Sequence, residues 1–315
     1  MLFGALVWLR TRMYAWGLLR QHRIGKPVIV IGNLSVGGTG KTPLVVWLVE
    51  QLQAQGRRPG IALRGYRGRA AATMTARLVQ PDSDAGEVGD EALLLRLRTG
   101  APVAIGRDRV QAAHELVRQG VDVIVCDDGL QHLRLARDHE VVVIDAARGL
   151  GNGYLLPAGP LRESAARLRR VDSIVLNGEG AVTDPTLGGI APIFVMRLVG
   201  DQIWPLLGTG EPASLAQLAG KRVHAVAGIG NPQRFFSQLV AAGLDVIGHP
   251  FPDHHRFQAS ELRFGDELPL LMTEKDAVKC RGLAVSNCWY LPVAASFAPE
   301  QRSALLARLQ PILSR

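Results

Sequence analysis

Short runs of apolar, often β-branched residues alternate along the chain with longer stretches in which apolar positions recur at helical spacing. The first run, Val-Ile-Val-Ile at 28–31, lies between Pro27 and Gly32, which is typical of a buried parallel strand. The same pattern predicts further strands at 60–63, 102–105, 121–126, 140–144 and 173–176, with helices at 43–55, 88–99, 107–119 and 161–169. This alternation predicts an α/β fold, a mostly parallel sheet sandwiched by helices.

A change of composition divides the chain. Residues 184–213 are rich in glycine and proline, with a short strand expected at 194–198, and we interpret them as a connection between domains. A second series of strands (222–227, 270–272, 289–293) and helices (232–242, 276–281, 299–313) follows. We expect an N-terminal helical segment at 1–25, a first domain at 26–190, a linker at 191–213 and a second, smaller α/β domain at 214–315.

The N-terminal segment mixes apolar and basic side chains, and the first acidic residue of the chain is Glu50. A spanning helix needs about 20 apolar residues in succession, and Arg10 and Arg12 interrupt the run. A signal peptide is not expected either, because the basic residues follow the apolar stretch. On one helix, Arg12, Arg20 and Arg23 would fall within an arc of about 80°. Two interpretations stay open: an amphipathic helix on a membrane surface, or a helix docked on its own core.

Composition narrows the class of partner. Lys and Arg number 36 against 28 Asp and Glu, a net charge of +8, which favours anionic partners such as phosphate-rich substrates, nucleic acid or an anionic membrane. The three cysteines show neither metal-site nor disulfide spacing, which is typical of a reducing compartment such as the cytoplasm.

A glycine-rich loop, IGNLSVGGTGKTP at 31–43, joins the first strand to the first helix. It matches the end of the P-loop pattern G-x-x-x-x-G-K-[ST], with serine at the first glycine position. Backbone N–H groups of such a loop cradle phosphates, while Lys41 would reach the β- and γ-phosphates and the Thr42 hydroxyl would hold Mg²⁺. Valine before the glycine pair argues against a group of ATPases that position other molecules and carry lysine there. The predicted loop residues are Ser35, Val36, Gly37, Gly38, Thr39, Gly40, Lys41 and Thr42.

Acidic residues follow at two places. The strand VDVIVCDD ends in Asp127 and Asp128, where open α/β sheets bind ligands. Asp127 would contact Mg²⁺, and Asp128 could do the same or accept a proton; capping the next element is the alternative. Asp90 and Glu91 begin a predicted helix, either as catalytic groups or as caps.

Two further loops carry polar groups. In the sequence Asp253-His254-His255, proton handling is favoured over a metal site, because no further Cys/His cluster completes a zinc set. The sequence RGYRGR at 64–69 is a basic, glycine-rich loop suited to anionic groups.

Nine motifs occur in one order: IGNLSVGGTGKTP, RGYRGR, GDE, GRDR, DDGLQH, LPAGPLRE, GIGNPQRF, FPDHHRF and TEKDAVK. This combination resembles the tetraacyldisaccharide 4′-kinase family over nearly the whole chain. The resemblance implies two α/β/α domains joined by a β-stranded hinge, the first with a P-loop. It also implies transfer of phosphate from ATP, with Mg²⁺, to the 4′-hydroxyl of an acylated glucosamine disaccharide 1-phosphate. The product would be lipid IVA, made at the cytoplasmic face of the bacterial inner membrane.

The resemblance also implies roles. Asp90 would be the general base and His254 would orient it from the second domain, so that substrate binding closes the domains. Glu91, Asp127 and Asp128 would serve magnesium and the nucleotide. Arg162 and Glu163 would lie near the phosphates. The N-terminal segment would be a peripheral membrane anchor, and we expect a monomer without nucleic-acid or protein partners.

Two other functions remain as alternatives. A P-loop ATPase or GTPase in metal delivery or assembly would account for the loop and Asp127, but not for the DHH sequence or the N-terminal segment. A non-enzymatic membrane adaptor with a degenerate nucleotide site is disfavoured by the intact Lys41, Thr42 and Asp127.

Overall fold

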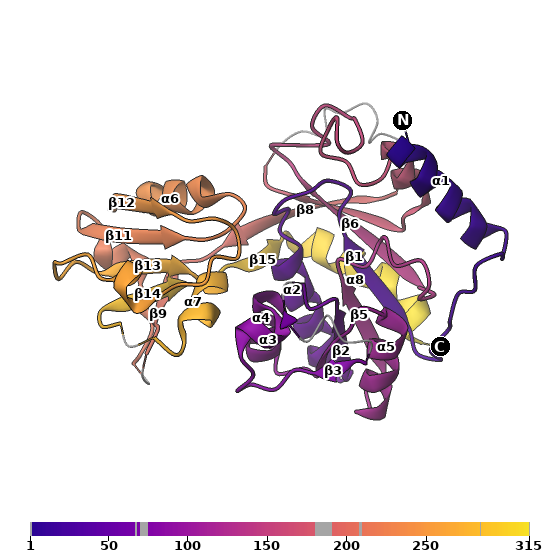
Figure 1. Cartoon of the computed structure of the whole chain (residues 1–315), viewed down its shortest axis with the longest axis horizontal. Coiled ribbons are helices and arrows are strands. Elements are labelled where there is room, and N and C mark those ends of the chain that lie inside the picture. The colour runs from indigo at the N-terminus through magenta and orange to yellow at the C-terminus, as the bar shows by residue number, and fades with distance from the viewer. Residues whose placement is uncertain are drawn as a thin grey trace.

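Two β-sheets organise the chain into two α/β domains (Figure 1). The computed structural model describes residues 2–66, 68–69, 75–179, 191–207, 210–283 and 285–314. Arg67 of the RGYRGR loop and the expected end of the first domain at 190 lie outside these residues. The larger sheet has the order β15 (Ala294–Phe297), β8 (Ile193–Val199), β7 (Ser173–Asn177), β6 (His139–Asp145), β1 (Val28–Gly32), β5 (Val123–Asp127), β2 (Pro59–Leu63), β4 (Val103–Ile105), β3 (Arg77–Leu78).

The large domain has helices on both faces of this sheet, whose central seven strands are parallel. One face packs against α2 (Lys41–Ala54), α4 (Asp90–Thr99) and α8 (Pro299–Leu313), and the other against α5 (Arg109–Arg118). The short helix α3 (Ala85–Val88) precedes α4. Strands such as β1 and β5 are buried along their whole length. This burial explains why they appear in the sequence as continuous apolar runs. The predicted α/β sandwich is confirmed.

In the residues that the structure describes, the small domain has its own sheet and two α-helices. Helix α6 (Pro232–Ala241) and helix α7 (Glu274–Cys280) contribute to separate hydrophobic clusters. Short 3₁₀ helices lie at Leu215–Leu218 and Ala259–Leu262. The strand order is β10 (Ala213–Ser214), β9 (Gln202–Pro205), β14 (Cys288–Leu291), β13 (Leu270–Thr273), β11 (Arg222–Ala227), β12 (Asp245–Pro250), of which the last four are parallel.

The chain crosses between the domains twice, which differs from the single linker and the continuous second domain at 214–315 that we expected. It leaves the large sheet after β8 and returns to it as β15, and both strands bridge the two domains in Figure 1. Helix α8 then packs on the large domain, because Leu305, Leu309 and Ile312 join the cluster that contains Trp47. The two crossings touch: a Cβ on Gly200 would lie 2.5 Å from the Pro292 carbonyl oxygen. They form a two-stranded connection between the domains.

Helix α1 (Leu2–Ala15) lies on the outside of the large domain (Figure 1). The N-terminal helix was predicted to extend to residue 25, but it ends at Ala15. Gly17, with φ 73°, interrupts the helical backbone. Arg20 and Arg23 lie beyond the helix, so the predicted arc of three arginines does not form. Within α1, none of the side chains that the structure describes is buried. No helix in the described parts of the chain is long and apolar enough to span a membrane.

Two other expectations differ from the structure. The helix predicted at 161–169 is a 3₁₀ helix at Ala165–Arg170 only, because the backbone before it pairs with the P-loop. Arg162 donates its N–H to the Leu34 carbonyl oxygen at 2.6 Å, and Val36 donates to that of Pro160 at 2.9 Å. Strand β12 was not predicted; its half-exposed residues, ending in His249 and Pro250, lack a continuous apolar run.

Candidate active site

The P-loop connects β1 to α2 as the sequence predicts, with Lys41 as the first residue of the helix. Asn33 is buried and donates through Nδ2 to the Ser35 carbonyl oxygen at 2.6 Å, which fixes the entry to the loop. Gly40 has φ 91°, and a Cβ there would lie 2.4 Å from Nδ2 of Asn177, so this position requires glycine. Helix α2 therefore begins with backbone N–H groups directed at the place where phosphates bind.

Three charged side chains converge beside the loop. Nζ of Lys41 lies 3.6 Å from Oδ1 of Asp128, and Nη1 of Arg162 lies 3.0 Å from Oδ2 of the same carboxylate. Burial would raise the pKa of Asp128, but the charges of Lys41 and Arg162 outweigh it and hold the pKa below its ordinary value. Asp128 is therefore ionised at neutral pH and orients two cations at the phosphate site.

Asp127 differs sharply from its neighbour. It ends β5 beside Ile31 of β1 and is 3% exposed, and its Oδ1 has no hydrogen-bond partner among the described residues. Burial and the nearby charge of Glu91 raise the pKa of Asp127 to about 7. A buried carboxylate oxygen without a partner, close to the charge of Glu91, can be stabilised by a proton or by a cation.

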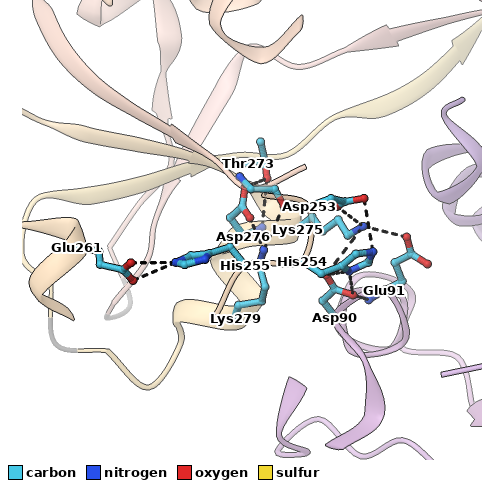
Figure 2. Close-up of polar contacts among 11 residues, drawn as sticks. Asp90, Glu91, Asp253, His254, His255, Glu261, Thr273, Lys275, Asp276 and Lys279 are labelled. Carbon is cyan, nitrogen blue, oxygen red and sulfur yellow. Dashed lines mark hydrogen bonds and ion pairs between the residues drawn. The ribbon is translucent and has the colours of Figure 1, made fainter. Parts of the chain in front are cut away.

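Asp90 meets His254 across the gap between the domains. Nδ1 of His254 lies 2.9 Å from Oδ2 and 3.2 Å from Oδ1 of Asp90, and Figure 2 shows the two side chains facing each other. Burial would raise the pKa of Asp90, but the hydrogen bond from His254 and the charge of Lys275 lower it below its ordinary value. Because an ionised carboxylate only accepts hydrogen bonds, Nδ1 of His254 carries the proton.

Lys275 of the small domain holds the acidic cluster together. Its Nζ lies 3.1 Å from Oε1 of Glu91, 3.6 Å from Oδ1 of Asp253 and 3.9 Å from Oδ2 of Asp90 (Figure 2). Burial would lower the pKa of Lys275, but the three carboxylates raise it above its ordinary value. Lys275 therefore stays charged and lets three carboxylates lie close together.

A buried aspartate supports the His254 loop. Asp276 is fully buried and accepts a hydrogen bond from the Gly228 N–H at 3.0 Å. The Gly228 carbonyl oxygen in turn accepts from the backbone N–H of His254 at 3.2 Å. His254 itself has φ 63°, a strained conformation for a residue other than glycine that persists where the surroundings impose it. The ring of His255 turns away and lies 3.1 Å from Glu261 (Figure 2).

Positive charge surrounds the loop that follows Asp128. Nη2 of Arg10, from α1, donates to the Gln131 carbonyl oxygen at 2.9 Å. Burial lowers the pKa of His132 to about 3, with further contributions from the charges of Arg109 and Arg64. His132 is therefore neutral at pH 7.

The structure brings together most of the predicted site residues. The P-loop, Asp127 and Asp128 share one edge of the large sheet, and Asp90, Glu91 and His254 meet at the domain boundary. Glu163 was predicted to bind the nucleotide; its carboxylate accepts from Nε2 of Gln131 at 2.6 Å and pairs with Arg167 at 3.4 Å.

Sequence reasoning missed several polar residues near the P-loop. Asp145 and Asn177 end β6 and β7, just as Asp127 ends β5. A polar residue at the end of an apolar strand is the sequence signal for both, as it is for Asp127. Lys275 and Arg234 lie in the motifs TEKDAVK and GIGNPQRF, but the sequence assigned neither a role, because their partners lie in the other domain.

Comparison with known proteins identifies the family. The profile described as "Tetraacyldisaccharide-1-P 4'-kinase" (LpxK) matches residues 1–310. Proteins named tetraacyldisaccharide 4′-kinase from Alkalilimnicola ehrlichii and Azoarcus sp. are 51% and 52% identical, over 100% and 98% of this chain and 92% and 90% of their own lengths. The solved LpxK of Aquifex aeolicus, described as in complex with ATP, is 27% identical with a TM-score of 0.82, over 99% of this chain and 96% of its own.

The family match runs from the N-terminal segment to α8, so it includes both domains and every part of the site. It does not favour a metal-delivery factor, and no group of three or more metal-binding side chains occurs among the residues that the structure describes. The resemblance seen in the nine motifs is confirmed, as is the expectation that the protein is an enzyme. The chain belongs to the tetraacyldisaccharide-1-P 4′-kinase family.

Proposed function

We propose that the chain transfers the γ-phosphate of ATP to the 4′-hydroxyl of a tetraacyldisaccharide 1-phosphate, with Asp90 as the general base. The observation that carries this proposal is the contact of 2.9 Å between Asp90 and His254. An ionised carboxylate, oriented by a histidine and placed near a P-loop, is equipped to accept a hydroxyl proton. His254 touches Asp90 and acts through it.

In this reaction the 4′-oxygen forms a bond to the γ-phosphorus as its proton moves to a carboxylate oxygen of Asp90. The bond from the γ-phosphorus to the bridging oxygen breaks, and ADP leaves with that electron pair. Such transfers depend mainly on positioning and on neutralising phosphate charge. Lys41 and Arg162, both held by Asp128, supply positive charge beside the loop.

The site also suits a magnesium ion. The unpaired, buried Oδ1 of Asp127 and the nearby charge of Glu91 fit a hard cation with oxygen ligands. Thr42, at the second position of α2, would complete the set together with the phosphates. When bound, the ion would neutralise charge on the nucleotide. Without it, the raised pKa of Asp127 reflects the cost of burying that carboxylate.

We further propose that the enzyme binds peripherally to the cytoplasmic face of the bacterial inner membrane, where its acylated substrate resides. Exposed apolar side chains gather at the N-terminus, since Leu6, Trp8, Trp16 and Leu18 are each 55% to 68% exposed. Arginines interspersed with such side chains are typical of proteins that lie on an anionic membrane surface. We expect a monomer that needs neither nucleic acid nor a protein partner.

The direct test is phosphoryl transfer by purified enzyme to a tetraacyldisaccharide 1-phosphate in detergent micelles. With ATP labelled at the γ-phosphate and Mg²⁺ present, the label should appear in the lipid. Phosphorus–proton coupling in the product should place it on the 4′-oxygen. ATP hydrolysis without labelled lipid would contradict the proposal and favour an ATPase of another kind.

A further inference from the structure

A second contact between the domains lies on the other flank of the P-loop from Asp127. Arg234, in the first turn of α6, reaches from the small domain to the ends of two strands of the large sheet. Its Nη1 lies 3.2 Å from Oδ2 of Asp145, at the end of β6, and its Nη2 donates to Oδ1 of Asn177, at the end of β7, at 3.4 Å.

Both partners of Arg234 also hold the P-loop. Nδ2 of Asn177 donates to the Thr39 carbonyl oxygen at 3.0 Å. Asp145 pairs with Arg148 at 3.7 Å, and Arg148 donates to the Gly38 carbonyl oxygen. Arg234 is therefore connected to the backbone of Thr39 through Asn177. It is connected to the backbone of Gly38 through Asp145 and Arg148.

The backbone of the small domain approaches the same place. A Cβ on Gly230, in the loop between β11 and α6, would lie 3.8 Å from the Gly38 nitrogen. Asn231 accepts the backbone N–H of Arg234 at 3.4 Å and so caps α6, which fixes the direction in which the arginine leaves the helix. The contact between the domains therefore involves the backbone of the loop between β11 and α6 as well as the Arg234 side chain.

The sheet order indicates which end of a nucleotide this flank would meet. Strand β1 lies between β5 and β6. Lys41, Asp127 and Asp128 mark the β5 side, where the γ-phosphate must lie to meet the acceptor. From the β5 side, the triphosphate of ATP would extend along the P-loop toward β6 and β7. The α-phosphate and ribose would therefore approach Asp145, Asn177 and Arg234.

We propose that Arg234 is a positioning residue that couples ATP binding to closure of the small domain. A nucleotide seated beside Asp145 and Asn177 completes the surface on which Arg234 docks. Because Arg234 and His254 belong to the same domain, docking of Arg234 brings His254 to Asp90. This inference rests on the proposed function, since it assigns ATP the task of assembling the pair that activates the acceptor.

The test uses ATP binding and domain closure as readouts. The three native cysteines are buried, so spin labels can be placed at Gln111→Cys on α5 and Ser286→Cys in the small domain, both exposed positions. In the otherwise wild-type protein, ATP with Mg²⁺ should narrow the distance distribution between the labels. In Arg234→Ala the narrowing should be lost, and the KM for ATP should rise about five- to tenfold, while kcat at saturating ATP changes less.

Two matched variants complete the experiment. Arg234→Lys keeps the charge and should recover part of the ATP-dependent narrowing. Arg222→Ala removes an exposed ion pair with Asp245 in the same domain and should behave as the wild type. Thermal unfolding of each variant identifies any that fail to fold, in which case Arg234→Lys carries the comparison.

The proposal is overturned if Arg234→Ala closes on ATP as the wild type does, or if only kcat falls and the KM for ATP is unchanged. Failure of the proposed function gives a different result. The wild type would then close on ATP, and Arg234→Ala would not, although no phosphate reaches the lipid.

Discussion

At the scale of single residues, the site depends on two aspartates whose surroundings move their pKa values in opposite directions. His254 and Lys275 hold the pKa of Asp90 below its ordinary value, whereas burial and Glu91 raise that of Asp127 to about 7. When the pKa values of two carboxylates are shifted apart, the two groups can perform different tasks. Asp90 is ready to accept a proton, and Asp127 is ready to exchange a proton for a cation.

Replacing His254 should change the pH dependence of catalysis. In His254→Ala the pKa of Asp90 should rise, because burial is then opposed by Lys275 without the histidine. We expect the acid limb of the kcat/KM profile to move to higher pH and kcat to fall about 10²-fold. His255→Ala is the matched control, since His255 pairs with Glu261, and its acid limb should stay in place. Superimposable acid limbs for His254→Ala and the wild type would contradict the role given to His254.

The raised pKa of Asp127 predicts how stability depends on pH in the protein without metal or nucleotide. Between the ordinary pKa and about 7, the folded state binds more protons than the unfolded state, so the free energy of unfolding falls as pH rises through 7. Relative to Asp127→Asn, the wild type should lose stability, on the order of 1 kcal/mol, between pH 6 and pH 8. Urea unfolding of both proteins measures this difference, and parallel stability curves would show that Asp127 does not titrate there.

At the scale of elements, α1 has apolar surface that its own domain does not cover. Trp8 is 55% exposed, with Arg12 stacked 5.5 Å from the centre of its ring, and Tyr154, in the loop after β6, is 65% exposed. Leu155 of that loop lies against Gly4 of α1. Residues from two segments therefore form one apolar, basic surface.

This surface should bind membranes. Trp8→Ser combined with Trp16→Ser should weaken binding to vesicles that contain anionic phospholipid by at least about tenfold, because burying one large apolar side chain contributes about 1.5–3 kcal/mol. Trp204→Ser is the control, since Trp204 is 40% exposed in the small domain. Co-sedimentation with vesicles measures the effect, and raised salt should weaken the wild type further. Equal binding by all three proteins would show that α1 does not contact lipid.

Elements with a strong local signal could be predicted from the sequence, and elements defined by long-range contacts could not. Strand β11 and helix α8 have the predicted bounds, because their apolar patterns are complete. The helix expected at 161–169 forms only as the 3₁₀ helix Ala165–Arg170, because Leu161 and Arg162 pair with a loop more than 120 residues earlier. The first helix is shorter than expected because Gly17, with its left-handed backbone conformation, interrupts the helical path just after Ala15.

At the scale of the whole molecule, the site is assembled from two domains joined by two strands. Asp90 and His254 are 164 residues apart in sequence, and Arg234 and Asp145 are 89 apart. The first pair was predicted only through family resemblance, since no local pattern links an acidic helix start to a histidine in another domain. The return of the chain as β15 and α8 was not predicted, because their residues suit either sheet equally well.

We propose that Asp90, brought to His254 by closure, accepts the proton of the 4′-hydroxyl. Single-turnover phosphoryl transfer with Asp90→Asn, alongside ATP binding measured on the same preparation, tests this role. We expect the transfer rate to fall about 10²–10⁴-fold, while the Kd for ATP stays within about threefold of the wild-type value. If ATP binding weakens as much as transfer slows, Asp90 serves the nucleotide and is not the general base.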